Sequence, residues 1–108
     1  MNELHNLESF YDSLSSEMEW APADLHPHGV STNAYDDVAR LLENVPKGGK
    51  ALEIGCGMGK FSVSIAERFD ELVGTDISSV GVEIAKEKQT ENLPDLDQKV
   101  SYIAANAD

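Results

Sequence analysis

Apolar residues recur at two different spacings along the chain, and the change of spacing predicts alternating strands and helices. Short apolar runs at 50–54, 72–77 and 100–104 predict three strands. Between these runs, apolar residues at helical spacing predict one helix after residue 59 and another after residue 78. A further helix is predicted before the first strand, with Ser31 or Thr32 as its N-cap and with Tyr35, Val38, Leu41 and Leu42 on one face. Strands that alternate with helices are typical of a parallel sheet. The pattern therefore predicts an α/β fold.

Residues 1–30 form a separate predicted region, an N-terminal helix followed by a loop that contains prolines and histidines. Apolar residues recur at helical spacing over 2–19, and the two prolines that follow cannot occupy a helix interior. Packing of this helix on the rest of the domain is the simpler interpretation. The alternative is a flap over a bound ligand, with Tyr11 or Trp20 in contact with that ligand.

His26 and His28 are two residues apart in this loop, a spacing at which two imidazoles can share a metal ion. No third cysteine or histidine follows at a known ligand spacing, so we expect a solvated loop and no metal site. If the loop lies beside a ligand pocket, His28 is the residue that we expect to touch a substrate.

The charge of the chain narrows the range of partners. There are 20 acidic residues against 8 basic ones, a formal charge of -12. Nucleic-acid binding depends on Lys and Arg to neutralise phosphates, and an anionic membrane also attracts basic residues, so we expect neither partner. The single cysteine excludes an internal disulfide, no apolar run approaches a membrane span, and the first residues do not resemble a signal peptide. We expect a cytoplasmic protein.

The stretch 51–78 carries the candidate chemistry. Gly55, Gly57 and Gly59 follow the first predicted strand, and Asp76 ends the second one. Glycines let the backbone turn sharply and approach a ligand closely, and a carboxylate at the tip of the second strand can accept hydrogen bonds from two ribose hydroxyls. The stretch therefore has the order of the front half of a nucleotide-binding α/β unit.

The spacing of the glycines distinguishes between two classes of cofactor. In the dinucleotide pattern G-x-G-x-x-G the last position would be Lys60, because Gly59 comes one residue early. Glu53, two residues before the first glycine, would also face the like charge of a pyrophosphate. A cationic or amine-rich ligand suits Glu53 better, and an NAD-type domain is the less favoured alternative.

The segment EIGCGMG, residues 53–59, resembles motif I of the class I S-adenosylmethionine-dependent methyltransferases, in which an acidic residue precedes x-G-x-G-x-G. The resemblance extends over about 34–108. It implies a Rossmann-like three-layer sandwich, here truncated to about three parallel strands in the order 3-2-1 with flanking helices. On this basis 31–108 would be the cofactor-binding half of a methyltransferase domain. Residues 1–30 precede the resemblance, and a cofactor flap stays the alternative interpretation of that region.

The resemblance also implies a role for each candidate residue of the site. Glu53 would orient the methionine end of S-adenosylmethionine, the three glycines would admit the cofactor, and Asp76 would hold its ribose. Ile77 would pack on the adenine ring. Asn106 and the backbone near it would contact the adenine amino group, with Asp108 as a second candidate. The full set of expected cofactor-binding residues is Glu53, Gly55, Cys56, Gly57, Gly59, Asp76, Ile77, Asn106 and Ala107.

Cys56 lies between two of the glycines, where a nucleophilic role is conceivable. No histidine and aspartate are placed beside it in the sequence, and small buried cysteines are common, so we interpret Cys56 as a packing residue of the loop.

The function implied by the resemblance is methyl transfer from S-adenosylmethionine to an unidentified, small-molecule acceptor, with S-adenosylhomocysteine as the product. The family takes its acceptor-binding residues and any base from segments after a fourth strand, so the catalytic residues stay unknown. We favour a truncated piece of a longer enzyme. The alternatives are a homodimer or complementing chain that uses the exposed edge of the first strand, and a non-catalytic cofactor-binding or partner-binding module.

Overall fold

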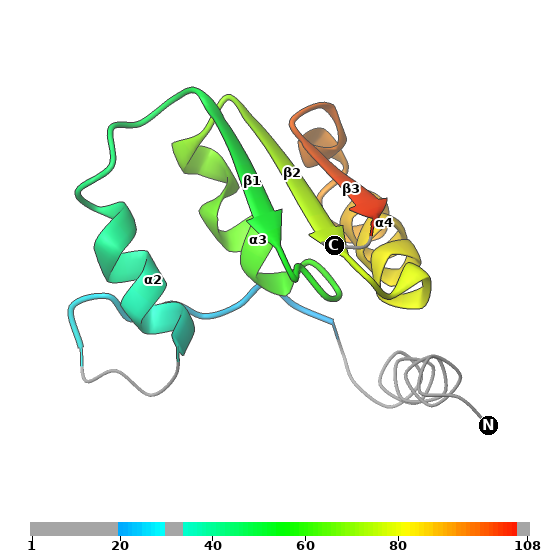
Figure 1. The fold of residues 1–108 in the computed structure, drawn as a ribbon, viewed down its shortest axis with the longest axis horizontal. Coiled ribbons are helices and arrows are strands. Elements are labelled where there is room, and N and C mark those ends of the chain that lie inside the picture. Colours follow the sequence, from blue (N-terminus) through cyan, green and yellow to red (C-terminus); the bar gives the residue numbers. More distant parts are fainter. Residues whose placement is uncertain (1–19, 30–33, 106–108) are drawn as a thin grey trace.

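The structure, a computed structural model, describes residues 20–29 and 34–105. A parallel sheet of three strands, in the order β1-β2-β3, lies at its centre (Figure 1). The strands are β1 (Lys50–Ile54), β2 (Glu71–Asp76) and β3 (Val100–Ala104). This is the predicted order, so the α/β prediction with three parallel strands is confirmed. The N-terminal helix expected over 2–19, with Tyr11, and the expected site residues Asn106 and Ala107 lie outside the described residues, as does Asp108.

Helices connect the strands as the sequence pattern predicts. The structure has α2 (Ala34–Leu42) before β1, α3 (Lys60–Ile65) and the 3-10 turn η1 (Ala66–Arg68) between β1 and β2, and α4 (Ser79–Asn92) and η2 (Pro94–Gln98) between β2 and β3. Ser78 is the N-cap of α4, because its hydroxyl accepts a hydrogen bond from the Gly81 amide at 3.1 Å. None of the helices in 20–29 and 34–105 is long and apolar enough to cross a membrane.

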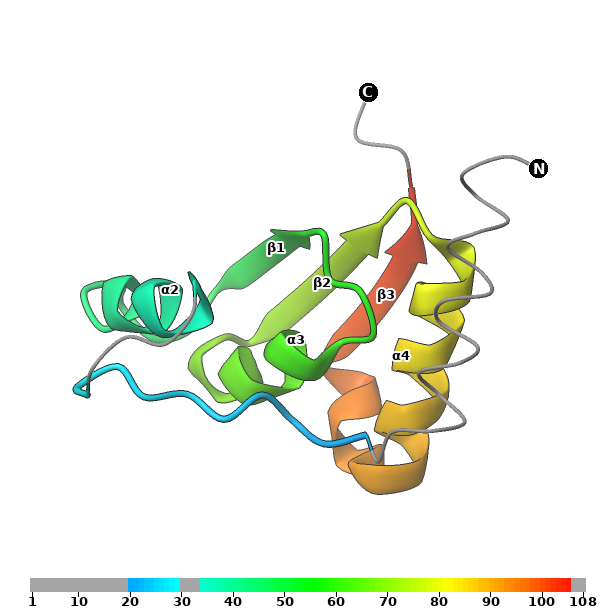
Figure 2. The same cartoon turned by 90° about the horizontal axis from the view of Figure 1, so that it is seen from below.

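The core lies between the sheet and two helices. Figure 2 shows α3 and α4 on the same face of the sheet. Because side chains alternate along a strand, every second residue faces these helices. Leu72 of β2 pairs with Val100 of β3, and Gly74 pairs with Tyr102, on the face that the helices cover. All four of these residues are buried. The side chains of this face therefore hold the helices on the sheet.

The opposite face of the sheet is apolar and exposed within the described part of the chain. Leu52 is 65% exposed, Ile54 71% and Ile103 52%. β1 is also an edge strand of the described sheet, since it pairs only with β2 there. The homodimer or complementing chain expected at this edge stays a prediction.

Candidate functional site

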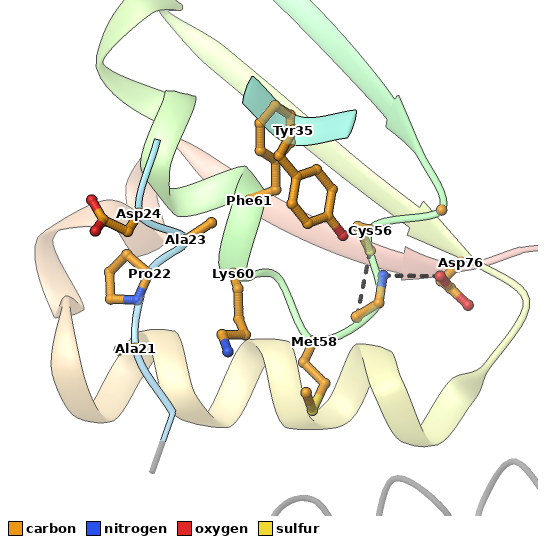
Figure 3. A pocket seen from close by; sticks show the side chains of 12 residues that line it. Ala21, Pro22, Ala23, Asp24, Tyr35, Cys56, Met58, Lys60, Phe61 and Asp76 are labelled. Carbon is orange, nitrogen blue, oxygen red and sulfur yellow. Dashed lines mark hydrogen bonds between the residues drawn. The ribbon is translucent and has the colours of Figure 1, made fainter. Parts of the chain in front are cut away.

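A cavity of ≈ 670 Å³ opens at the carboxyl end of β1, where the glycine loop leaves the sheet (Figure 3). Ligands of open α/β sheets bind at this end of the strands, because the loops that follow the strands gather there. Parts of the 20–29 segment, α2, the glycine loop, α3 and β2 build the wall. Its lining residues are Ala21, Pro22, Ala23, Asp24, Tyr35, Gly55, Cys56, Gly57, Met58, Lys60, Phe61 and Asp76.

The glycine loop has a backbone that only glycine adopts readily. Gly55, Gly57 and Gly59 have φ angles of 82°, 55° and 80°, all in the left-handed region. The amides of Gly55 and Cys56 both donate to the carbonyl of Thr75, at 2.7 Å and 2.9 Å, which ties the start of the loop to β2. Nothing lies within 4 Å of the position that a Cβ on Gly55 would take, so the backbone there is open to a ligand.

Asp76 ends β2 with its carboxylate directed at the glycine loop. Its Oδ2 atom accepts a hydrogen bond from the Gly57 amide at 2.9 Å (Figure 3). Its Oδ1 atom accepts one from the Ser78 amide, also at 2.9 Å. These two bonds fix the carboxylate at the rim of the cavity. A carboxylate has about four lone-pair sites, so Asp76 keeps acceptor capacity for a ligand.

Glu53 lies behind the loop, on the side of the sheet that faces α3. It does not line the cavity, and its carboxylate accepts a hydrogen bond from the Ser62 hydroxyl. Burial raises the pKa of Glu53, the nearby Asp76 charge raises it further, and the bond from Ser62 lowers it. The Glu53 carboxyl group therefore lies beneath the loop, where burial favours its neutral form and a bound cation would favour its charged form.

Cys56 lies in the cavity wall with only 7% of its surface exposed. Burial raises the pKa of its thiol to about 12, and the charges of Glu53 and Asp76 add to this effect. At neutral pH the side chain is therefore a protonated thiol and a weak nucleophile, which agrees with a packing role.

Ile77 contributes to a smaller cavity that adjoins the larger one. This cavity of ≈ 120 Å³ shares Gly55 and Asp76 with the larger one, and its other lining residues are Ile54, Thr75, Ile77 and Ala105. The Ile77 side chain is 62% exposed. The structure thus brings Ile77 close to Asp76 but outside the larger cavity, and its expected contact with adenine stays a prediction.

Two aromatic residues at the site come from the N-terminal part of the chain. Tyr35 of α2 stacks on Phe61 of α3, with ring centroids 4.9 Å apart and an interplanar angle of 15° (Figure 3). Its spacing on α2 predicts only a packing face, so its place in the cavity wall was not evident from the sequence. Trp20 donates through Nε1 to the Met58 carbonyl at 3.0 Å, which attaches the 20–29 segment to the glycine loop.

The histidines of the 20–29 segment do not line the cavity. His28 pairs with Glu43 at 2.7 Å, and His26 pairs with Asp24 at 3.3 Å. The buried Asp36 accepts a hydrogen bond from the His26 amide at 2.9 Å and so ties this segment to α2. Across 20–29 and 34–105, no group of three or more His, Cys, Asp or Glu residues could hold a metal ion.

Comparison with known proteins identifies the family. Residues 51–108 match the family model described as "Methyltransferase domain". The chain belongs to this family, and its fold is that of the S-adenosylmethionine-dependent methyltransferases.

Two curated relatives match parts of the chain. YqeM of Bacillus subtilis (strain 168), assigned as a methyltransferase, is 29% identical over 75 residues, which cover 68% of this chain and 30% of YqeM. A tRNA/tmRNA (uracil-C(5))-methyltransferase of Colwellia psychrerythraea is 42% identical over 45 residues, which cover 42% of this chain and 12% of that enzyme. The chain thus spans less than a third of either relative. The name of this second relative includes a tRNA substrate. It therefore disagrees with our expectation, based on the negative charge of the chain, that nucleic acid is not a partner.

Solved structures share the fold at low sequence identity. Magnesium protoporphyrin IX methyltransferase (ChlM) from Synechocystis PCC 6803, with bound S-adenosylmethionine, has a TM-score of 0.61 at 17% identity, covering 98% of this chain and 55% of that one. The [4+2]-cyclase SpnF has a TM-score of 0.63 at 19% identity, covering 94% and 42%. Because a protein named as a cyclase has the same fold, the fold alone does not define the reaction.

Proposed function

We propose that the ≈ 670 Å³ cavity binds S-adenosylmethionine, and that 31–108 is the cofactor-binding half of a methyltransferase domain. The observation that carries the proposal is the contact between Asp76 and the glycine loop. Asp76 Oδ2 lies 2.9 Å from the Gly57 amide nitrogen, within a loop whose three glycines are all left-handed. Membership of the methyltransferase family and the S-adenosylmethionine bound to ChlM support this assignment.

The proposed roles follow from position and charge. The open backbone at Gly55 lets the ligand contact main-chain atoms, and the free lone pairs of Asp76 accept hydrogen bonds from ribose hydroxyls. Glu53, beneath the loop, stabilises the positive charges of the ammonium and sulfonium groups through space. Ile77, in the adjoining cavity, provides an apolar surface for the adenine. Asn106 and Ala107 remain proposed adenine contacts by resemblance alone.

S-adenosylmethionine, when bound, supplies an electrophilic methyl group for attack by the acceptor. The residues of this chain bind and orient the cofactor, and we assign none of them to proton transfer. Because the chain spans 30% of YqeM, we propose that the groups binding the acceptor lie outside these 108 residues.

Isothermal titration of the chain with S-adenosylhomocysteine tests the proposal. We expect saturable binding that weakens at least tenfold, that is by about 1.4 kcal/mol, in Asp76→Ala. Glu87→Ala is the matched control, because it removes an exposed carboxylate of α4 that does not line the cavity, and it should leave the affinity unchanged. NADH binding without S-adenosylhomocysteine binding would favour the NAD-type alternative and contradict the proposal.

For the acceptor, we infer a small molecule and not RNA. The support is the charge of -12 and the composition of the cavity wall, where Asp24 and Asp76 outweigh Lys60. The tRNA substrate in the name of the Colwellia enzyme is the argument against it. Fluorescence anisotropy with labelled tRNA tests the inference on this chain, and saturable tRNA binding would overturn it.

A further inference from the structure

A chain of polar side chains runs beneath the glycine loop, and the predicted site includes only its first member. It starts at Glu53 of β1, whose carboxylate accepts a hydrogen bond from Ser62 of α3. Tyr102 of β3 lies beside Ser62, and burial raises the pKa of its phenol. Tyr102 then donates to Gln89 Oε1 of α4 at 2.8 Å. Ser62, Gln89 and Tyr102 are all buried.

The far end of this polar chain fixes the orientation of Gln89. Its Nε2 atom lies 2.9 Å from Asp97 Oδ1 and 3.0 Å from the Val100 carbonyl oxygen. Both neighbours are acceptors, so the amide nitrogen must point at them and the amide oxygen must point at Tyr102. Asp97 also accepts from Thr90 at 2.7 Å. Tyr102 therefore faces one fixed acceptor and holds its hydroxyl in one direction.

Tyr102 is also in close contact with the glycine loop. A Cβ on Gly59 would lie 2.8 Å from Tyr102 Oη, and a Cβ on Gly74 would lie 2.9 Å from Tyr102 Cδ1. The ring is thus enclosed between the last glycine of the loop and the middle strand, and only 4% of Tyr102 is exposed. In such a packed place, a shift of the phenol moves the loop above it.

We propose that Tyr102, held by Gln89, is a positioning residue that fixes the position of the glycine loop through its contact with Gly59. This inference rests on the proposed function, because its consequence is the affinity for the cofactor. Phenylalanine would fill the same space without any need for a partner, whereas a buried hydroxyl requires one. The hydroxyl supplies a directional contact under Gly59 and beside Ser62 that an apolar ring lacks.

The test is a double-mutant cycle of Tyr102→Phe and Gln89→Met. Each single variant leaves one buried polar atom of the Tyr102–Gln89 bond without its partner and lowers the free energy of unfolding. Gln89→Met also removes the amide donor of Asp97 and of the Val100 carbonyl, in the single and in the double variant alike. The double variant has no unpaired atom of the Tyr102–Gln89 bond, so it should recover part of the stability that Gln89→Met loses. Urea unfolding measures stability, and isothermal titration with S-adenosylhomocysteine measures affinity.

We expect Tyr102→Phe to bind S-adenosylhomocysteine about tenfold more weakly, and the double variant to stay weak although part of its stability recovers. The Gly57 amide resonance, which reports on the loop but not on direct contact with Tyr102, should remain shifted in the double variant. If Tyr102 only supported the fold, the affinity for S-adenosylhomocysteine and the Gly57 amide resonance would return toward their original values as stability recovers. That result would overturn the inference. If the unmodified chain binds but Tyr102→Phe binds equally well, only the positioning role fails. If the unmodified chain does not bind, both proposals fail.

Discussion

Gly59→Ala should destabilise the chain by two separable effects. Gly59 has φ 80°, and alanine in the left-handed region costs about 1–2 kcal/mol. The new methyl group would also lie 2.8 Å from Tyr102 Oη and 3.0 Å from Ala85 Cβ, which are both buried. Overpacking of this kind typically costs about 1–3 kcal/mol. The expected loss is therefore about 2–5 kcal/mol, a large share of the stability of a small domain.

Gly49→Ala is the matched control for the backbone effect. Gly49 has φ 76°, almost the same as Gly59, but nothing lies within 4 Å of the position of its Cβ. Gly49→Ala should therefore lower the free energy of unfolding through the backbone effect alone, by about 1–2 kcal/mol. The difference between the two variants, about 1–3 kcal/mol, measures the contact between the loop and Tyr102.

Urea unfolding followed by far-ultraviolet circular dichroism gives both free energies. Adding Tyr102→Phe to Gly59→Ala should recover part of the loss, because the nearest atom is removed while Tyr102 Cζ and Ala85 Cβ remain at 3.0 Å. Equal losses for Gly59→Ala and Gly49→Ala would refute the reasoning, since the loop would then not rest on Tyr102.

Three further predictions follow from burial and hydrogen bonding. The raised pKa of Glu53 means that its contribution to stability is present at low pH and is lost as pH rises through that pKa. Glu53→Gln should therefore be the more stable protein at neutral pH and the weaker binder of S-adenosylhomocysteine. If the free energies of unfolding of Glu53→Gln and of the unmodified chain changed with pH in the same way, this prediction would be wrong. Cys56, with a pKa of about 12 against 9.0 for an ordinary thiol, should react with iodoacetamide about a thousandfold more slowly than a free thiol until urea unfolds the chain. Rapid labelling of the folded chain would count against its burial. Arg68→Met should lower the free energy of unfolding by about 1–3 kcal/mol, since the guanidinium donates to the carbonyl of Leu42, the last residue of α2, and to that of Val45. An unchanged thermal midpoint would show that these bonds contribute nothing.

The features that could be predicted from the sequence are those with local signals. Apolar runs at strand spacing locate β1, β2 and β3, and the spacing of the loop glycines relative to Asp76 predicts the rim of the cavity. These signals work because a strand, a tight turn and the next strand follow one another within 51–78. Even here, α3 ends at Ile65 and continues as the 3-10 turn η1, where apolar spacing alone predicts one longer helix.

The features that could not be predicted depend on contacts between distant segments. Glu53, Ser62, Gln89 and Tyr102 come from four elements, and no sequence spacing connects them. In the sequence, Tyr35 has the helical spacing of any apolar residue in an amphipathic helix. In the structure, its ring forms part of the cavity wall. Helical periodicity indicates which face is buried but not what that face meets.

The central claim is that the glycine loop and Asp76 hold S-adenosylmethionine. The most direct measurement is a titration of the isotope-labelled chain with S-adenosylhomocysteine, followed by amide resonances in NMR. The account predicts saturable shifts at Gly55 and Gly57, whose backbone lines the cavity, and no comparable shifts at Glu87 on the exposed side of α4. Absence of saturable shifts at the two glycines, or shifts confined to other parts of the chain, would contradict it.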